Sequence, residues 1–441
     1  MNCQDNSGGR DGDVYGVAGL TLARRRAILT VLAIALILDG VDQQMLPLAS
    51  PMLMSEWQLG YSQMGQALVS ALVGMTLGTM AGGIAGDRFG KRRVVIFSTA
   101  AFALATLAIG LASSIVQVVA LRFASGLAFG AIMPNAIAIA ALLASPASRV
   151  KVIAFLVVCI PVGAMIGALA GSWLLPSLGW RLSFIVCGAL PLGLAFGMIY
   201  LLPRFEPVKT ADSSAGAALS APASRKQRDG KTRFAGLDEI LGPKTRQLTF
   251  AAWLMFFANG YGVYALSNWM PIILSDAGLS INEASNAIFG FTMAAIAGSY
   301  VATIAIGRMG TVISGILFMS AICVFLTILI SIFYLYPNII ILIILNFMLC
   351  GLALGALQTT CYVFASSSYP EEAGATGIGL AVTFNRAGGM IAILLSGSIL
   401  NFYGGNPIFF LSVILSLMFL INLIIIFMRR SLSTRHSALQ S

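Results

Sequence analysis

The chain has 441 residues, of which 58% are hydrophobic and only 10% are charged. A soluble domain carries about 25% charged residues, so this composition excludes an ordinary water-soluble protein. The net charge of +10 does not indicate nucleic-acid binding, because the lysines and arginines cluster at the ends of apolar segments. These segments are about 20 residues long, enough to cross about 30 Å of hydrocarbon. The sequence therefore predicts an all-α protein embedded in a lipid bilayer, with no nucleic acid among its partners.

In chain order, a polar and Gly-rich stretch ends at Arg24-Arg25-Arg26 and leads into the first apolar segment. That segment is too long for a cleaved signal peptide, so we expect a retained helix. Polar or Gly/Pro-rich breaks separate about twelve such segments, each predicted to be a transmembrane helix. The predicted spans are 27–48, 62–85, 94–113, 116–143, 151–174, 182–202, 248–274, 286–306, 311–333, 338–365, 376–400 and 407–428.

The longest polar segment, 203–247, is rich in Pro and Ser and contains the basic stretch 225–228. It separates two sets of six predicted helices. Because lysines and arginines mark cytoplasmic segments, their placement predicts that both termini and this linker face the cytoplasm from an inner membrane. The predicted organisation is a cytoplasmic tail (1–26), an N-terminal six-helix bundle (27–202), a cytoplasmic linker (203–247), a C-terminal six-helix bundle (248–428) and a cytoplasmic tail (429–441).

The two halves of the sequence resemble each other, with the second copy lying between 220 and 225 residues after the first. Parallel repeats of this kind place a substrate site near the middle of the membrane. We therefore expect a transporter made of two related halves. The matched segments begin at Gly40 and Gly262, at Gly86 and Ile306, at Gly126 and Gly351, and at Gly163 and Gly388.

The first predicted helix contains Asp39 and Asp42 within an otherwise apolar run. Ionisable residues inside a membrane helix are costly, and by default they mark an ion or substrate pathway. Their spacing of three residues projects both carboxylates from one side of the helix. We expect both to carry protons; the alternative is a packing role in which neighbouring donors satisfy them.

The break after the second predicted helix has glycines, an aspartate and basic residues at fixed spacing, from Gly83 to Arg93. A plain cytoplasmic loop would also be basic, but this spacing resembles the loop signature of the major facilitator superfamily. The resemblance covers essentially the whole chain. It implies the major facilitator fold, with twelve transmembrane helices in two parallel-repeat six-helix bundles. It also implies gating or structural roles for Gly86, Asp87, Arg88, Gly90, Lys91, Arg92, Arg122, Pro161, Gly163 and Gly167.

Within that superfamily, the run Asp39-Gly40-Val41-Asp42 resembles the aromatic acid:proton symporter family. The segments Met133–Asn135, Ser267–Pro271 and Asp276–Ser280 support the resemblance. It implies proton-driven import of a ring carboxylate such as a benzoate or hydroxybenzoate. The sequence departs from the family in lacking a Glu within 140–145, in carrying Glu371-Glu372 after the Tyr-Pro pair, and in a second-half loop that keeps only Gly307-Arg308.

Arg386 lies about eleven residues into its predicted helix, or ~16 Å at 1.5 Å per residue, which is close to mid-membrane. Its planar guanidinium suits a carboxylate, so we expect it to bind the substrate anion. The alternative is a structural ion pair with Asp39 or Asp42. The other candidate substrate-binding residues are polar or aromatic side chains of the same helices: Asn135, Tyr264, Gln358, Phe384 and Asn385, with Tyr261, Asn268, Trp269 and Tyr362 as further cavity candidates. Trp269, near a helix end, has an interfacial anchor as its alternative role.

The remaining composition favours no enzyme. The one histidine lies in the C-terminal tail and the six cysteines form no close pair, so we expect no metal site, no disulfide and no cofactor. The sequence thus predicts a secondary transporter that imports an aromatic acid anion with protons by alternating access. Two alternatives remain open: a proton symporter of a non-aromatic organic anion, and a multidrug exporter of the same fold. A membrane enzyme or sensor is the least favoured class.

Overall fold

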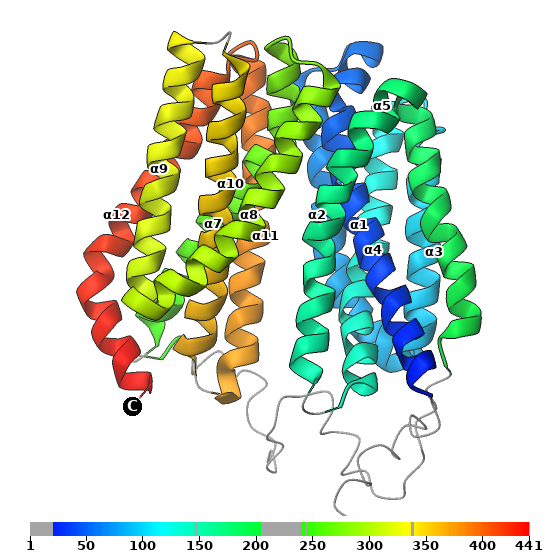
Figure 1. Cartoon of the computed structure of the whole chain (residues 1–441), viewed down its shortest axis with the longest axis horizontal. Coiled ribbons are helices and arrows are strands. Elements are labelled where there is room, and N and C mark those ends of the chain that lie inside the picture. The colour runs from blue at the N-terminus through cyan, green and yellow to red at the C-terminus, as the bar shows by residue number, and fades with distance from the viewer. Residues whose placement is uncertain are drawn as a thin grey trace, which may run out of the picture. The chain divides into compact units, whose positions relative to one another are not determined.

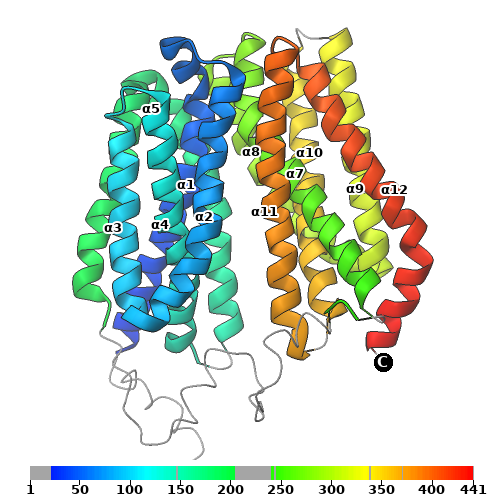
Figure 2. The same ribbon diagram turned by 180° about the vertical axis from the view of Figure 1, so that it is seen from behind.

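The computed structural model describes residues 21–145, 148–203, 240–242, 245–336, 339–369 and 371–440. Most of the predicted N-terminal tail and linker lies outside the described residues, and so do the side chains of Glu371 and Glu372. The described chain is all helical (Figures 1 and 2). Its helices are α1 (Leu22–Trp57), α2 (Tyr61–Phe89), α3 (Lys91–Ile109), α4 (Ile115–Leu143), α5 (Arg149–Leu201), α7 (Arg246–Asp276), α8 (Ile281–Met309), α9 (Thr311–Leu335), α10 (Ile340–Ser368), α11 (Glu371–Phe402) and α12 (Pro407–Gln440).

The helices have the length and composition of membrane spans. In the described part of the chain, ten are long and apolar enough to cross a bilayer, and α7 is the exception. Helix α7 is less apolar because it carries polar residues such as Asn259, Ser267 and Asn268. Helix α5 is 53 residues long, but Gly179 interrupts it with a φ of 73° and a ψ of 168°. Only glycine adopts that conformation without strain, so α5 is two helices joined at Gly179.

The contacts divide the chain into two compact units. The first contains the described residues within 1–43, 70–167 and 178–213, and the second contains the remainder. In the first unit an apolar core collects side chains of α1, α3, α4 and α5, including Leu32, Phe102, Phe129 and Leu156. In the second unit α7 packs on α11, α8 on α10 and α9 on α12. The second unit also includes Gln44–Val69 and Ala168–Ser177, which the sequence places in the first set of six helices.

Close helix contacts repeat between the two halves of the sequence. In the first half, a Cβ on Gly126 of α4 would overlap the backbone of Ala71 in α2. In the second half, a Cβ on Gly351 of α10 would overlap Phe291 in α8 in the same way. Small residues let membrane helices approach this closely. The pair α2–α4 therefore corresponds to α8–α10, as the matched glycines predict.

One detail of the repeat differs from the match seen in the sequence. A Cβ on Gly40 would overlap the carbonyl of Ile160 in α5, and a Cβ on Gly260 would overlap that of Asn385 in α11. Gly262 meets only the side chains of Met418 and Leu354. The structural counterpart of Gly40 is thus Gly260, two residues before the one the sequence match indicates. The error arose because both glycines lie in a Gly-Tyr-Gly run and only the backbone contact distinguishes them.

Candidate functional site

The two aspartates of α1 lie inside the first unit, where only 3% of Asp39 and 4% of Asp42 is exposed. The glycine between them explains how α1 brings them there. A side chain on Gly40 would overlap the backbone of α5, and one on Gly163 of α5 would overlap Ile37. The helices cross with their backbones in contact, so the run Asp39–Asp42 is fixed at a helix crossing away from lipid.

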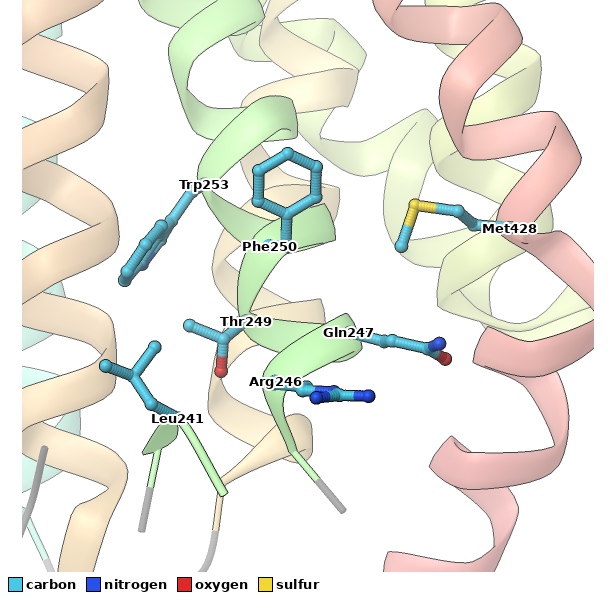
Figure 3. A pocket seen from close by; sticks show the side chains of 7 residues that line it. All are labelled: Leu241, Arg246, Gln247, Thr249, Phe250, Trp253 and Met428. Carbon is cyan, nitrogen blue, oxygen red and sulfur yellow. The ribbon is translucent and has the colours of Figure 1, made fainter. Parts of the chain in front are cut away.

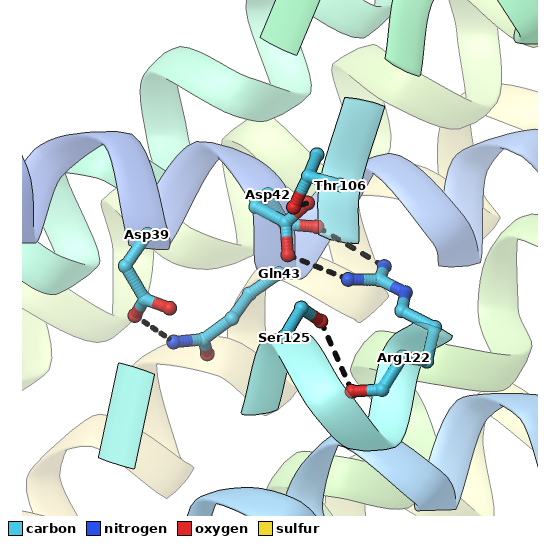
Figure 4. A network of polar contacts seen from close by, with 6 residues as sticks. All are labelled: Asp39, Asp42, Gln43, Thr106, Arg122 and Ser125. Carbon is cyan, nitrogen blue, oxygen red and sulfur yellow. Dashed lines mark hydrogen bonds and ion pairs between the residues drawn. The ribbon is translucent and has the colours of Figure 1, made fainter. Parts of the chain in front are cut away.

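Asp42 is part of a buried ion pair. Arg122 of α4 donates from Nη1 to Asp42 Oδ2 at 2.6 Å and from Nη2 to the Asp42 carbonyl oxygen at 3.2 Å (Figure 4). Thr106 of α3 donates to the other carboxylate oxygen at 3.3 Å. The Arg122 guanidinium also lies 5.7 Å from the ring centroid of Phe184. Asp42 is therefore balanced by a full charge, and α1, α3 and α4 are joined through it.

Asp39 has a different environment. The side-chain amide of Gln43, one helical turn further along α1, donates to Asp39 Oδ2 at 2.5 Å (Figure 4). Asp42–Arg122 and Asp87–Lys91 form ion pairs in the described part of the chain, and neither pair includes Asp39. A buried carboxyl whose hydrogen-bond partner is a neutral amide takes up a proton at lower cost than one held in an ion pair, because no partner charge is left unbalanced. The two aspartates are thus chemically unequal.

In the second half of the chain, the position equivalent to Asp39 holds a neutral residue. With Gly260 as the counterpart of Gly40, Asp39 corresponds to Asn259 of α7. Asn259 is buried and donates to the carbonyl oxygen of Leu354 at 2.9 Å, so it joins α7 to α10. An amide does not titrate. Of these two equivalent positions, only Asp39 can change its charge.

The loop between α2 and α3 turns at Gly90, where φ is 92°. Arg92, just after the turn, donates to the carbonyl oxygens of Ile199 at 2.6 Å and Leu202 at 2.7 Å. These carbonyls lie at the C-terminal end of α5, where backbone acceptors are unpaired and a positive charge is favoured. Asp87 and Lys91 are 4.0 Å apart at the surface, an exposed pair of small energetic value. Arg92 therefore joins α3 to the end of α5.

Several predicted residues serve helix packing in this structure. Asn135 of α4 donates to the carbonyl oxygens of Gly82 at 2.8 Å and Ala131 at 2.9 Å. A Cβ on Gly86 would overlap the Asn135 amide. A Cβ on Gly167 of α5, one turn after Gly163 and six residues after Pro161, would overlap the backbone of Val41 in α1. Arg88 lies 5.5 Å from the ring centroid of Phe89.

In the second unit, the predicted substrate residues lie on α7, α10 and α11. Arg386 and Tyr264 both interact electrostatically with the hydroxyl of Tyr362. Phe384 stacks on Trp253 with ring centroids 4.5 Å apart and planes at 13°. Asn385 donates to the carbonyl oxygen of Phe256 at 3.0 Å, which commits its amide to the α7–α11 contact. Gln358, also of α10, is exposed.

A pocket of about 330 Å³ lies at the beginning of α7. Figure 3 shows Phe250 and Trp253 from α7 and Met428 from α12 along its walls. Arg246 and Gln247 also line it, but its surface is almost entirely apolar. Because the Trp253 ring is also the partner of Phe384, this pocket adjoins the aromatic pair that precedes Arg386.

Four side chains of these sites were not among the predicted residues: Gln43, Thr106, Phe184 and Trp253. Gln43 had a usable signal, since it lies four residues after Asp39 on the same helix face. Thr106 and Phe184 come from α3 and α5, and no spacing in the sequence connects them with α1. Their roles became visible only through the tertiary contacts with Asp42 and Arg122.

The fold and the buried charges define a multi-pass helical membrane protein. The sequence pattern described as the Major Facilitator Superfamily matches residues 32–333 and 252–440. The chain belongs to this superfamily of transporters and is not an enzyme.

Its relatives include transporters of aromatic acids. It is 27% identical over 398 residues to a gallate transporter of Pseudomonas putida, with 87% of each chain covered. It is 26% identical over 410 residues to a 4-hydroxybenzoate transporter of Acinetobacter baylyi, with 86% of each covered. A cis,cis-muconate transport protein of the same organism is 29% identical over 364 residues, covering 81% of this chain and 84% of that one.

Solved structures show the same fold. A D-xylose–proton symporter superposes with a TM-score of 0.72 at 16% identity, covering 91% of this chain and 97% of that one. At this identity the likeness establishes the arrangement of helices alone.

Proposed function

We propose that this transporter imports an aromatic carboxylate together with protons, and that Asp39 carries the coupling proton. The observation that supports this most is the contrast between the two aspartates: Asp42 is paired with Arg122, whereas Asp39 is buried against a neutral amide. The gallate and 4-hydroxybenzoate transporters among the relatives support the substrate class.

Charge explains why the two loads travel together. An aromatic acid is an anion at neutral pH, and moving one charge against the membrane potential costs about 2.3 kcal/mol per 100 mV. A proton bound at Asp39 offsets the charge of a bound anion, so the loaded protein moves no net charge. The coupling is a free energy between two sites, in which each ligand favours the state that the other binds best.

We propose that Arg386 binds the substrate carboxylate. Arginine presents a planar fork of donors that matches a carboxylate, whereas lysine is a compact point charge. The hydroxyl of Tyr362 lies within electrostatic range of both Tyr264 and Arg386. Phe384, two residues before Arg386 in α11, stacks on Trp253 of α7, and these rings offer an aromatic surface. A ring carboxylate needs both features, an anion partner and a flat apolar wall.

Substitution of Arg386 tests this assignment. We expect Arg386→Lys to retain expression and to weaken binding of the acid by about 1.5–3 kcal/mol, through loss of one charge-assisted hydrogen bond. The neutral amide of the same compound should distinguish wild type from Arg386→Lys only weakly. Binding is measured on purified protein by calorimetry. Equal affinity of both proteins for the acid would place the anion elsewhere.

We further propose twelve spans, with both termini and the linker in the cytoplasm, from the distribution of Lys and Arg. The break at Gly179 and the length of helix α7 support two spans beyond the ten that hydropathy identifies. A cysteine placed within the linker should resist an impermeant thiol reagent added to intact cells. It should react once the cells are permeabilised. Rapid labelling of intact cells would reverse the orientation.

A second substrate class has one observation in its favour. The relative named as a cis,cis-muconate transport protein is as similar to this chain as the aromatic acid transporters are. Competition separates the classes: uptake of labelled 4-hydroxybenzoate is measured with an excess of unlabelled gallate, benzoate or muconate. We expect the ring acids to compete and muconate not to. Inhibition by muconate alone would identify an open-chain diacid carrier.

A further inference from the structure

The end of α1, the turn after it and the start of α2 belong to the second unit, whereas the rest of both helices belongs to the first. Residues Gln44–Val69 form their contacts with the second unit, although the sequence places them in the first six-helix set. Three elements of the second unit lie against this segment: the end of α7, the end of α11 and the turn between α11 and α12. The segment therefore joins the two sequence halves at one end of the helices.

A hydrogen bond between residues 215 positions apart in the sequence holds this contact together. Tyr61, the first residue of α2, donates its hydroxyl to Oδ2 of Asp276, the last residue of α7, at 2.8 Å. Beneath it the Trp269 ring is fully buried, with its centroid 6.4 Å from that of Tyr61. Its indole nitrogen donates to the carbonyl oxygen of Ile393 in α11 at 3.2 Å. Trp269 is thus an internal packing residue, and the alternative of an interfacial anchor is wrong.

Glycines shape the surface that receives these rings. A Cβ on Gly397 would lie 3.0 Å from both the Trp269 ring and the Tyr61 carbonyl oxygen. A Cβ on Gly65 would lie 3.3 Å from the Trp269 ring. Gly405, with a φ of 79°, approaches the Tyr61 hydroxyl so closely that any side chain would displace it. Because these three residues have no side chain, the Tyr61 and Trp269 rings can pack directly against the backbone at these positions.

The turn after α7 holds Asp276 in position. Gly278 has a φ of 88°, and the Leu279 amide donates back to the carbonyl oxygen of Leu274 at 3.0 Å. Ser280 and Glu283 then form a reciprocal capping box that starts α8. Asp276 is thus an exposed acceptor at the end of α7, next to a turn that is closed by a backbone hydrogen bond.

We propose that Tyr61, Asp276 and Trp269 form a latch that closes the transport path at this end of the helices and must open once in each cycle. The proposal rests on the proposed function, since alternating access requires the two repeat halves to separate first at one face and then at the other. A contact between halves is then present in one state and absent in the other. One exposed hydrogen bond above a shape-matched apolar contact suits this role, because it biases the closed state without locking it.

The test uses full-length protein in nanodiscs, where an impermeant thiol reagent reaches both faces. A reporter cysteine replaces Met64, which is fully buried one turn after Tyr61, in a chain whose native cysteines are replaced. We expect Tyr61→Phe and Asp276→Ala each to raise the labelling rate by up to about tenfold, equivalent to about 1.4 kcal/mol. The double variant should label no faster than either single one, because both remove the same bond.

Two controls make the result specific. Tyr300→Phe removes a hydroxyl from a residue that is 73% exposed on α8 and should leave the rate unchanged. A cysteine at Leu111, which is 68% exposed, should label equally in every variant and reports on folding. Unchanged labelling at Met64 in both single variants, or additive effects in the double variant, would overturn the latch.

The readout separates the latch from the proposed function, because labelling needs no substrate. Cross-linking cysteines at positions 61 and 276 through a cleavable reagent gives the second measurement. Transport should stop and should recover on cleavage. If these variants label faster but the protein transports no aromatic acid, the latch proposal stands and the substrate assignment is wrong. Undiminished transport by the cross-linked protein would reject the latch alone.

Discussion

Asp39→Asn should abolish accumulation of an aromatic acid against its gradient and leave exchange of internal for external substrate intact. The asparagine keeps the size of the side chain and can still accept the hydrogen bond from Gln43. It cannot bind and release a proton. Loading and reorientation with substrate therefore continue, while the proton gradient no longer drives them. The two activities are measured in proteoliposomes as pH-driven uptake and as counterflow.

Thr106→Val is the matched control for this variant. It removes one long hydrogen bond, of 3.3 Å, to Asp42 and leaves both the Asp42–Arg122 pair and Asp39 in place. We expect it to accumulate substrate close to the wild-type level. Near-normal accumulation by Asp39→Asn itself would show that the coupling proton is bound elsewhere.

Asp42→Asn should instead destabilise the protein by about 3–5 kcal/mol, the cost of leaving a buried charge without its partner. Arg122 is only 3% exposed, so its guanidinium cannot reach water when Asp42 loses its charge. Arg122→Gln should destabilise the protein by a similar amount, because it leaves the buried Asp42 carboxylate without its partner. The measurement is thermal unfolding of the purified protein in detergent, with the amount of folded protein in membranes as a second readout.

The double variant Asp42→Asn with Arg122→Gln identifies the cause. Two neutral amides of similar size replace a buried pair, and such replacement is commonly neutral or even stabilising. We expect the double variant to recover most of the lost stability, which gives a large coupling energy between the positions. Additive losses would mean that each residue stabilises the protein through other contacts, and that the ion pair contributes little.

The sequence was sufficient for the fold because the bilayer imposes a strong rule. Every backbone polar group must be paired inside the membrane, so long apolar segments predict helices directly. Glycine spacing added the packing partners: the matched runs at Gly126 and Gly351 lie in equivalent helix contacts. Helix α7, which the sequence predicts as a span over 248–274, is less apolar than the other spans because it contains Asn259 and Asn268, although both side chains make internal hydrogen bonds.

The chemistry of the site was less accessible from sequence. Asp39 and Asp42 have the same side chain three residues apart, and no pattern distinguishes them. What separates them is Arg122, 80 positions away from Asp42, whose guanidinium reaches one carboxylate and not the other. The role of Asn135 was equally hidden, because an amide that pairs with backbone carbonyls and one that faces a substrate look alike in sequence. Such differences arise from tertiary contacts alone.

Uptake by the purified protein in proteoliposomes tests the central claim most directly. An inward pH gradient is imposed without a membrane potential, and labelled 4-hydroxybenzoate, gallate or benzoate is supplied outside. At least one ring acid should accumulate above its external concentration, and a protonophore should abolish this accumulation. Asp39→Asn should match the protonophore-treated wild type. Accumulation that persists in the presence of the protonophore would contradict proton coupling and the role assigned to Asp39.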